Sequence, residues 1–526
     1  MAERGEAFDV AIIGAGLAGL TLALQLRQTS PQRTIVILEK STFPPPAAAH
    51  KVGEATVEIG AHYLAHTLGL KSLLEESQLR KFGLRLFFGA GNRDDLSFAD
   101  ELGASSLLPA ISYQLDRGVL ETSLTTLLLE RGVDIRHESR VAGVEFGDGA
   151  DAHRLNVLSG NGKSTVSCRW VVDASARSAV LKRQLGLRAS SRHRMSAAWF
   201  RLDETISVDD WSSDADWQAR CNGLSRMPST NHLMGCGYWA WIIPLVNGRT
   251  SIGLVTDPDT HSLATYDSFD RFRQWLAGHQ PLLAGPVDAA ADRLMDFNKL
   301  RNLSQDSKRV WSADRWAMTG ECGVFTDPFY SPGTDFIALG NTFIADLISR
   351  DCPPAETGIR ATVYEKLYRS FYESTMSLYE GQYGGFGDTR LMSIKLTWDY
   401  AYYWSILAWL FFRDVLTDLN FLREAQAAIN EIRTLNESMQ AHFLERAAER
   451  RVDTGRGRFV DQIGIPLMVD LNTALLQARG PLQQELQANC RRLQRLAPML
   501  RDMLNRRPVD RSDARELLGD LERRLA

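Results

Sequence analysis

Three glycines near the start of the chain, Gly14, Gly16 and Gly19, have the GxGxxG spacing of a turn that binds a dinucleotide. An apolar run at residues 8–13 precedes the turn, an apolar helical pattern follows it, and a second apolar run ends at Glu39. Gly14 permits a tight turn, Gly16 lets the backbone approach a pyrophosphate, and Gly19 lets the helix pack closely on the strand. The helix N-terminus offers N–H groups to the phosphates, and Glu39 is placed to accept hydrogen bonds from ribose hydroxyls. The stretch therefore predicts a βαβ unit that binds a dinucleotide.

Three later stretches favour FAD over NAD. Arg117 and Glu121 belong to an xxRxxLE pattern that opens a helix, Asp173 follows a strand and precedes small residues, and a late turn contains Asp327. Together they resemble the flavoprotein monooxygenases and their relatives, in which the late turn places an acid on the ribityl chain. The resemblance also implies cofactor contacts from a further set of residues: Lys40, Gly53, Arg117, Val141, Pro328 and Gly333. The chain has no second GxGxxG unit, so we expect no dedicated NAD(P)H domain.

The late turn leads into a helix whose N-terminus is expected to point at the flavin. Ser331 is predicted as the N-cap and Pro332 as the first helical residue, because an apolar helical stripe follows them. A helix N-terminus at that place would stabilise the negative charge of the reduced flavin. Two positions depart from the common pattern of these flavoproteins: Glu321 stands where they carry Asp, and Ala176 where they usually carry Gly.

Trp239, Trp241 and Pro244 belong to the run Trp-Ala-Trp-Ile-Ile-Pro, which fits the WxWxIP motif of the flavin-dependent halogenases. The resemblance to that family covers residues 8–350. Residues two apart in a strand point to the same face, so both indoles can wall one passage. The alternative is a half-buried strand with two tryptophans in the core. Because this spacing rarely arises by chance, we favour the wall of a substrate tunnel.

Lys81 lies in a stretch, residues 79–88, that is similar to the one in which halogenases carry their catalytic lysine. In that family reduced flavin and O2 convert halide to hypohalous acid, which is diffusible and weakly electrophilic. An ammonium can hydrogen-bond this acid and help hydroxide leave, or a neutral amine of lowered pKa can be halogenated to a chloramine. Either route places one lysine between flavin and substrate. Lys51 competes for the role because it lies beside Gly53, but the resemblance favours Lys81.

The halide needs N–H donors near the flavin, and the turn after Ser331 is where the family provides them. Pro332 has no N–H, so the donors would be the amides of Gly333 and Thr334. Tryptophan halogenases carry an essential Glu where this chain has Tyr330, which argues against tryptophan as the substrate. The Asp-Pro-Phe-Tyr-Ser-Pro-Gly form looks more like halogenases of small phenols, whose hydroxyl already activates the ring.

The amino-acid composition restricts the classes of partner that we expect for this protein. The chain has 526 residues, 44% of them hydrophobic, and a formal net charge of −4, which gives no reason to expect nucleic acid or an anionic membrane. The six cysteines are scattered without CxxC or His/Cys clusters, so no metal site is expected. Residues 1–7 are polar and lead straight into the first strand, and residues 400–412 fall short of the roughly 20 apolar residues of a membrane span. We therefore expect a cytoplasmic protein.

The predicted fold class is α/β: a Rossmann-like FAD-binding domain with an inserted sheet subdomain and a helical C-terminal region. The FAD-binding domain is expected at residues 1–196 and again at 301–350. Alternating strands and polar loops predict the insert, on the substrate side, at residues 197–300. Helical periodicity dominates residues 351–526, where the aromatic-rich stretch 398–412 fits either a pocket for a planar substrate or core packing.

These features predict a halogenase that installs chloride or bromide on an electron-rich small aromatic ring, a free phenol above all. Its FAD would arrive as FADH2 from a separate NAD(P)H-dependent flavin reductase that acts transiently. Two alternatives remain open. One is a flavin-dependent aromatic monooxygenase of the same fold, and the other is a flavin-binding protein without catalysis, with the helical tail as its working part.

Overall fold

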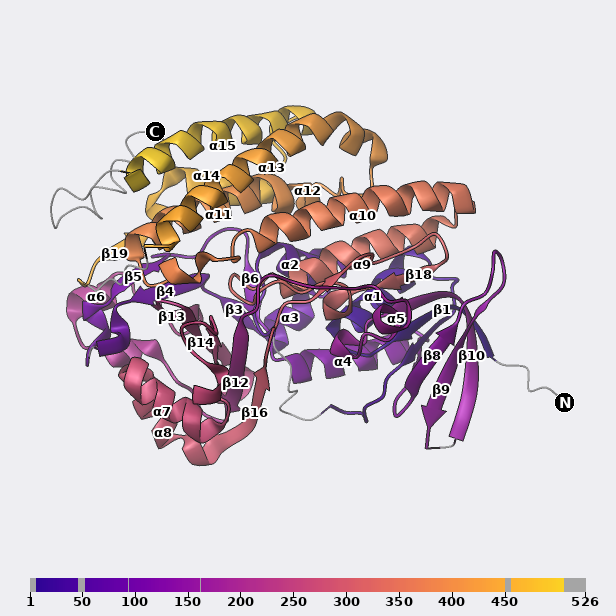
Figure 1. The fold of residues 1–526 in the computed structure, drawn as a ribbon, viewed down its shortest axis with the longest axis horizontal. Helices are drawn as coiled ribbons and strands as arrows, with labels where there is room; N and C mark the ends of the chain where they lie inside the picture. Colours follow the sequence, from indigo (N-terminus) through magenta and orange to yellow (C-terminus); the bar gives the residue numbers. More distant parts are fainter. Residues whose placement is uncertain (1–5, 46–52, 93, 161, 450–455, 506–526) are drawn as a thin grey trace. The chain divides into compact units, whose positions relative to one another are not determined.

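The chain folds into two compact units (Figure 1). The computed structural model describes residues 6–45, 53–92, 94–160, 162–449 and 456–505. Unit 1 comprises Met1–Ser77, Leu115–Ser191 and Ser304–Glu373, and unit 2 comprises Gln78–Gln114, Arg192–Leu303 and Ser374–Ala526. The segment Gln78–Gln114, expected in the first part of the FAD-binding domain, packs in unit 2 because its strands join the sheets of that unit. Residues 351–373, expected in the helical region, pack in unit 1.

Unit 1 is built around a seven-stranded sheet. Its order is β7 (Asp134–Arg136), β2 (Ile35–Leu38), β1 (Glu6–Ile13), β10 (Gly162–Asp173), β9 (His153–Ser159) and β8 (Arg140–Glu145), with β18 (Trp316–Met318) also beside β10. The strands β7, β2, β1, β10 and β18 run parallel, whereas β9 is antiparallel to both β10 and β8. The second half of β1 and all of β2 are buried, as expected for parallel strands that helices cover. A short pair, β11 (Arg188–Ala189) and β17 (Asp306–Ser307), completes the strands of the unit.

The helices of unit 1 pack on this sheet. Helix α1 (Leu17–Thr29) follows the glycine turn, and α4 (Arg117–Glu130) begins where Asp116 accepts hydrogen bonds from the amides of Gly118 and Val119. Helix α9 (Gly333–Arg350) is tied to α1 through Asn341, whose Nδ2 donates to the Ala18 carbonyl at 3.2 Å, a hydrogen bond that contributes about 1 kcal/mol. The remaining helices are α2 (Glu58–His62), α3 (Lys71–Ser77), α5 (Val180–Gln184) and most of α10 (Pro354–Met376).

Unit 2 is built around an eight-stranded sheet. Its order is β16 (Leu294–Leu300), β12 (Ser196–Leu202), β15 (Arg249–Thr256), β14 (Tyr238–Leu245), β13 (Thr230–Gly235), β4 (Leu84–Phe88), β5 (Asp100–Gly103) and β19 (Phe459–Asp461). Only the pairs β13 with β4 and β5 with β19 are parallel. The sheet reaches beyond the predicted insert because β4, β5 and β19 lie outside residues 197–300. A second, two-stranded sheet joins β3 (Leu79–Lys81) to β6 (Ser112–Gln114).

The two faces of the large sheet are covered differently. Helices α7 (Phe269–His279) and α8 (Pro281–Ala289) pack on one face, where Phe272 and Leu283 join Ala240 and Leu254 in a single core. Strand residues that alternate with these core residues point to the opposite face. We call it the tryptophan face, and define it by Trp199, His232, Trp239 and Trp241.

The C-terminal helices of unit 2 form a bundle, drawn in orange and yellow in Figure 1. It contains α11 (Thr389–Tyr402), α12 (Ala408–Phe412), α13 (Leu419–Ala447), α14 (Pro466–Leu476) and α15 (Leu482–Asn505). The short α6 (Ala215–Ala219) lies between β12 and β13 in the chain. Trp398, Trp404 and Trp409 are buried, and the Trp398 indole donates to Asn436 at 2.9 Å. For these tryptophans the core interpretation of the aromatic-rich stretch holds. Among the described residues, no helix combines the length and apolar character needed to cross a membrane.

Candidate functional site

In the glycine turn between β1 and α1, two of the three glycines have no room for a side chain, and the third has. Gly14 has φ +108°, and a Cβ there would lie 2.7 Å from the Ala174 carbonyl oxygen. A Cβ on Gly19 would lie 2.1 Å from the carbonyl oxygen of Gly14, so only glycine fits. At Gly16 no atom lies within 4 Å of the Cβ position. The backbone at Gly16 therefore faces open space, which suits the approach of a pyrophosphate.

Two carboxylates hold this turn in place. Glu39 accepts from the amide of Ala15 at 2.7 Å and from the amide of Ser41 at 2.9 Å. Glu121, on α4, accepts from the amide of Leu17 at 3.1 Å, at the first residue of α1. The predicted ribose contact of Glu39 would thus come from a side chain whose orientation the turn itself already fixes.

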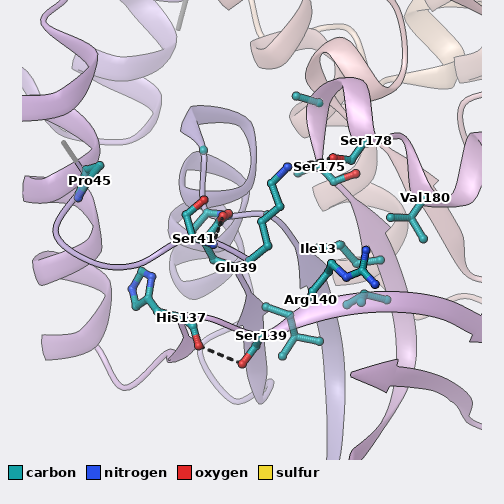
Figure 2. Close-up of a pocket in the computed structure, with 18 of the residues that line it drawn as sticks. Ile13, Glu39, Ser41, Pro45, His137, Ser139, Arg140, Ser175, Ser178 and Val180 are labelled. Carbon is teal, nitrogen blue, oxygen red and sulfur yellow. Dashed lines mark hydrogen bonds between the residues drawn. The ribbon is translucent and has the colours of Figure 1, made fainter. Parts of the chain in front are cut away.

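A cavity of about 650 Å³ opens beside the turn (Figure 2). Five residues predicted to bind the cofactor line it: Gly14, Gly16, Glu39, Lys40 and Val141. Several lining residues were not predicted, among them Ser139, Arg140, Ser175 and Arg183. Ser175 belongs to the small residues after Asp173 that favour FAD, and Arg140 precedes Val141 on β8, whereas nothing in the sequence context marks Ser139 or Arg183. The volume, the open backbone at Gly16 and the cationic side chains together fit the adenosine and phosphate part of a dinucleotide.

Gly53 and Arg117, which are distant in sequence, meet in unit 1. Gly53 has φ +98°, and the Arg117 guanidinium donates to its carbonyl oxygen at 3.4 Å. Arg117 also donates from Nε to Glu121 at 3.0 Å, so the xxRxxLE pattern connects the 53–60 loop to the glycine turn. Lys51, the competitor of Lys81, lies outside the described residues.

The late turn differs in detail from the prediction. Tyr330 and Ser331 both adopt left-handed φ values, 69° and 58°, and Asp327 is buried and accepts from the amide of Phe329 at 2.9 Å. Helix α9 begins at Gly333 and is preceded by Pro332, so the prediction that Ser331 caps the helix was wrong by one residue. The N-cap Pro332 has φ −77°, whereas Ser331 is left-handed, a conformation that is unusual for an N-cap.

The first amides of α9 remain available as donors. In the described part of the chain, no residue accepts a hydrogen bond from the amides of Gly333 and Thr334. The Thr334 side chain is buried against Gly60, where an added Cβ would lie 2.8 Å from the threonine Cβ. Asp335 accepts from the amide of Gly60 at 2.8 Å. Side chains thus anchor this helix end to α2 and leave two backbone donors there.

Both departures from the flavoprotein pattern have a structural consequence. Ala176 has φ 50°, a conformation that glycine adopts without strain. Glu321 forms an ion pair with Arg177 at 3.2 Å. Burial lowers the pKa of Arg177, and the Glu321 carboxylate acts in the opposite direction. The longer acid thereby gives a half-buried guanidinium its counter-ion.

The other predicted site residues, Lys81, Trp239, Trp241 and Pro244, lie in unit 2. The structure brings the two indoles together, with ring centroids 5.6 Å apart and only 2% of each side chain exposed. Trp239 donates to the Tyr383 hydroxyl at 2.9 Å, and Trp241 donates to Ser251 Oγ at 3.2 Å. Pro244 pairs with Thr250 beyond the end of β13, where the ladder needs no N–H from it.

Lys81 is the last residue of β3, opposite Ser112 of β6, and is 3% exposed. A side chain absent from the sequence predictions, His232, lies close to it on β13. His232 is opposite Trp241 in the sheet, and its ring centroid lies 5.4 Å from that of Trp239. Burial, and secondarily the Lys81 charge, lowers the pKa of His232 to about 3. No sequence signal marks this histidine, because it stands in a polar run that reads as a loop.

In the described part of the chain, no group of three His, Cys, Asp or Glu side chains lies close enough together to hold a metal ion.

Comparison with known proteins finds similarity to an FAD-binding domain and to flavin-dependent halogenases. Residues 7–240 match the FAD binding domain family. Flavin-dependent halogenase chlA of Dictyostelium discoideum is 26% identical over 433 residues, which cover 76% of this chain and 70% of that protein. Tetracycline 7-halogenase of Kitasatospora aureofaciens is 25% identical over 359 residues, 62% of this chain and 60% of the other. These matches confirm the predicted resemblance to the flavin-dependent halogenases. The protein is therefore an oxidoreductase that uses FAD, with halide as the co-substrate.

Solved structures show the same fold. The crystal structure of halogenase PltM superposes with a TM-score of 0.67 at 16% identity, over 93% of this halogenase and 98% of PltM. The flavin-dependent halogenase CmlS gives a TM-score of 0.58 at 18% identity, over 99% of this chain and 77% of that one. The α/β class with an FAD-binding Rossmann-like part and a helical C-terminal region is confirmed.

Proposed function

We propose that this halogenase transfers chloride or bromide to a small phenol and that Lys81 relays the hypohalous acid. FADH2 would come from a separate NAD(P)H-dependent flavin reductase in a transient encounter, in a soluble, cytoplasmic setting. The observation that carries the proposal is the burial of Lys81 beside the tryptophan face, because a lysine is rarely buried unless it has a partner or a task.

The overall reaction balances with halide as the species that is oxidised. When bound and reduced, FAD would supply two electrons and two protons, so that O2, halide and one further proton yield hypohalous acid and water. The ammonium of Lys81 donates a hydrogen bond to the oxygen of that acid. As a ring carbon attacks the halogen, the O–X bond breaks and the oxygen leaves as water with a proton from Lys81. Loss of the ring proton restores aromaticity, and reprotonation of the amine restores the site.

The amides of Gly333 and Thr334 are the proposed halide donors. They belong to an 18-residue helix, whose N-terminal dipole adds to the attraction for an anion. Their side chains do not compete, because Gly333 has none and Thr334 is packed against Gly60. The flavin contacts proposed for Asp327 and Pro328 place the cofactor's reactive end in the same turn.

The phenol class is inferred from Tyr330. Where tryptophan halogenases carry an acid, this chain has a phenol side chain with a left-handed backbone, so a ring that depends on a carboxylate base is disfavoured. A phenol needs less assistance because its own hydroxyl donates electron density to the ring. In support, one solved structure contains PltM in complex with phloroglucinol and FAD. We therefore choose phloroglucinol as the first test substrate.

The test is a halide-dependent product assay. Purified protein is supplied with FAD, a flavin reductase, NADH, O2 and chloride or bromide, and a panel of phenols that includes phloroglucinol is analysed by mass spectrometry. We expect halogenated product that disappears when halide is omitted. Hydroxylated product without halogen would replace the proposal with an aromatic monooxygenase. Bound FAD with neither halogenated nor hydroxylated product would point to the non-catalytic alternative.

A further inference from the structure

We propose that His232 is a positioning residue for the halogenation, whose Nε2 accepts a hydrogen bond from the Lys81 ammonium and fixes its direction. The inference rests on the proposed function of Lys81. It concerns contacts within unit 2 only.

The backbone brings Lys81 and His232 to the same place. The amide of Phe82, directly after Lys81, donates to the Pro228 carbonyl at 3.1 Å, and the amide of Thr230 donates to the Gly83 carbonyl at 3.0 Å. These bonds attach the end of β3 to the start of β13, two residues before His232. Gln114 on β6 adds a side-chain bond to Thr230 at 3.0 Å. The segment that carries Lys81 is therefore held to the strand that carries His232 from both sides.

The hydrogen bonds of His232 define its tautomer. Its Nδ1 lies 3.3 Å from the carbonyl oxygen of Arg85, and the backbone of Thr230 is a second hydrogen-bond partner of the ring. A carbonyl can only accept, so we assign the hydrogen to Nδ1, the atom that faces Arg85. A neutral imidazole has one N–H, which leaves Nε2 as an acceptor. Burial first, and then the nearby Lys81 charge, keeps the pKa of His232 near 3, so the ring is neutral at the pH of the reaction.

A neutral acceptor suits a lysine that must stay charged. A carboxylate would compensate the charge of the ammonium, whereas an imidazole fixes one N–H and leaves the charge and two further donors for the hypohalous acid. The ring itself is held by Trp239, so the tryptophan motif also orients the histidine. With a pKa near 3, His232 is too weak a base to take the ring proton, which restricts it to a positioning role.

The test compares His232→Leu, which removes the acceptor, with His232→Gln, whose side-chain carbonyl can stand in for Nε2. Met234→Leu, a buried residue two positions along β13, is the matched control. Two quantities are measured: halogenated phloroglucinol formed per O2 consumed, and the rate at which acetic anhydride modifies Lys81 in the folded protein without substrate, read by peptide mass spectrometry.

We expect His232→Leu to lower product per O2 at least about tenfold, the effect of losing one hydrogen bond to a charged group, while O2 consumption continues. Acetylation of Lys81 should become faster, since an ammonium without its acceptor loses its proton more readily. His232→Gln should restore most of both quantities, and Met234→Leu should change neither.

Two results would overturn the proposal. One is wild-type coupling and wild-type labelling in His232→Leu. The other is equal loss in the Leu and Gln variants, which would make the role structural. If His232→Leu fails to fold, the proposal is tested with His232→Gln alone. Its rate of Lys81 acetylation must then match that of the wild type, and a different rate would overturn the proposal. Lys81→Ala separates this proposal from the proposed function, because product retained in that variant refutes the lysine relay itself, whatever His232 does.

Discussion

The glycine turn beside the cavity of unit 1 is defined by close backbone contacts, whereas the tryptophan face of unit 2 is built from side chains. Around the cavity, the open backbone at Gly16 and the carboxylate of Glu39 come from one short βαβ unit. At the tryptophan face, His232 and Trp241 come from separate strands, and Lys81, whose charge lowers the pKa of His232, comes from a third. The first region therefore excludes an added side chain at Gly14 and Gly19, and the second depends on what each side chain donates or accepts.

The acidic side chains also have different kinds of partner in the two units. In unit 1 the acids Glu39 and Glu121 accept from backbone amides. In unit 2 the fully buried Glu101 is surrounded by the guanidiniums of Arg85, Arg226 and Arg220. Arg85 connects this cluster to the tryptophan face, because its side chain contacts Glu101 and its carbonyl contacts His232. Substitutions in either unit test whether the two regions differ in this way.

The largest expected effect is that of Glu101→Gln, which leaves the buried arginines without their counter-ion. We expect the free energy of unfolding of unit 2 to fall by about 3–5 kcal/mol, measured by denaturant titration. Glu437→Gln, an exposed partner of Arg433 in α13, is the control and should change nothing measurable. A loss no greater than that of the control would show that the cluster does not support the sheet.

The same cluster predicts a pH dependence. Burial alone would raise the pKa of Glu101, but the guanidiniums, that of Arg85 first among them, outweigh it and lower the pKa. A lowered folded-state pKa means that the stabilisation is present above the unfolded value, about 4.3, and is lost as the pH falls through the folded value. The thermal unfolding midpoint should therefore fall more steeply between pH 7 and pH 3 for the wild type than for Glu101→Gln. Parallel curves would contradict the assignment.

Gly19→Ala tests the backbone cavity. Its Cβ would lie 2.1 Å from the Gly14 carbonyl oxygen, so the turn must open, and we expect the dissociation constant of FAD to rise about a hundredfold. Gly278→Ala in α7 meets no atom within 4 Å and should leave FAD binding unchanged. Flavin fluorescence measures both. Wild-type affinity in Gly19→Ala would mean that the turn does not hold the cofactor.

Gly253→Ala tests the side-chain region. An added Cβ would lie 2.1 Å from the Trp241 ring, which must shift. We expect halogenated product to fall about threefold to tenfold, a cost of about 1 kcal/mol, with FAD affinity unchanged. Gly285→Ala in α8, where the Cβ meets open space, serves for comparison. An unaltered product rate would place the Trp241 indole outside the substrate path.

The smallest expected effect is a gain. Ala176→Gly relieves a left-handed alanine with φ 50°, so unit 1 should become more stable by about 1 kcal/mol, seen as a higher unfolding midpoint. Ala174→Gly, in the same loop but without a left-handed φ, should not gain. Equal behaviour of the two variants would remove strain as the explanation of this departure.

The two regions also differ in how far the sequence predicts them. The glycine turn and the start of α4 at Arg117 could be predicted because the determining residues are neighbours in the chain. His232 could not, because its meaning depends on the pairing of β13 with β14 and on hydrogen bonds to β4. Long-range strand pairing also places Gln78–Gln114, which include Lys81, in unit 2, whereas the sequence predicted them in the FAD-binding domain. The error at Ser331 was local, since two left-handed residues in succession leave no periodic signal.

The relay by Lys81 is tested most directly by halogenated product per O2 consumed in Lys81→Ala, with FADH2, halide and phloroglucinol supplied. Lys299→Ala, an exposed lysine of unit 2 paired with Asp267, is the matched control. The account predicts that Lys81→Ala still consumes O2 and binds FAD but loses product at least about a hundredfold, while Lys299→Ala behaves as wild type. Halogenated product at the wild-type yield per O2 in Lys81→Ala would contradict it.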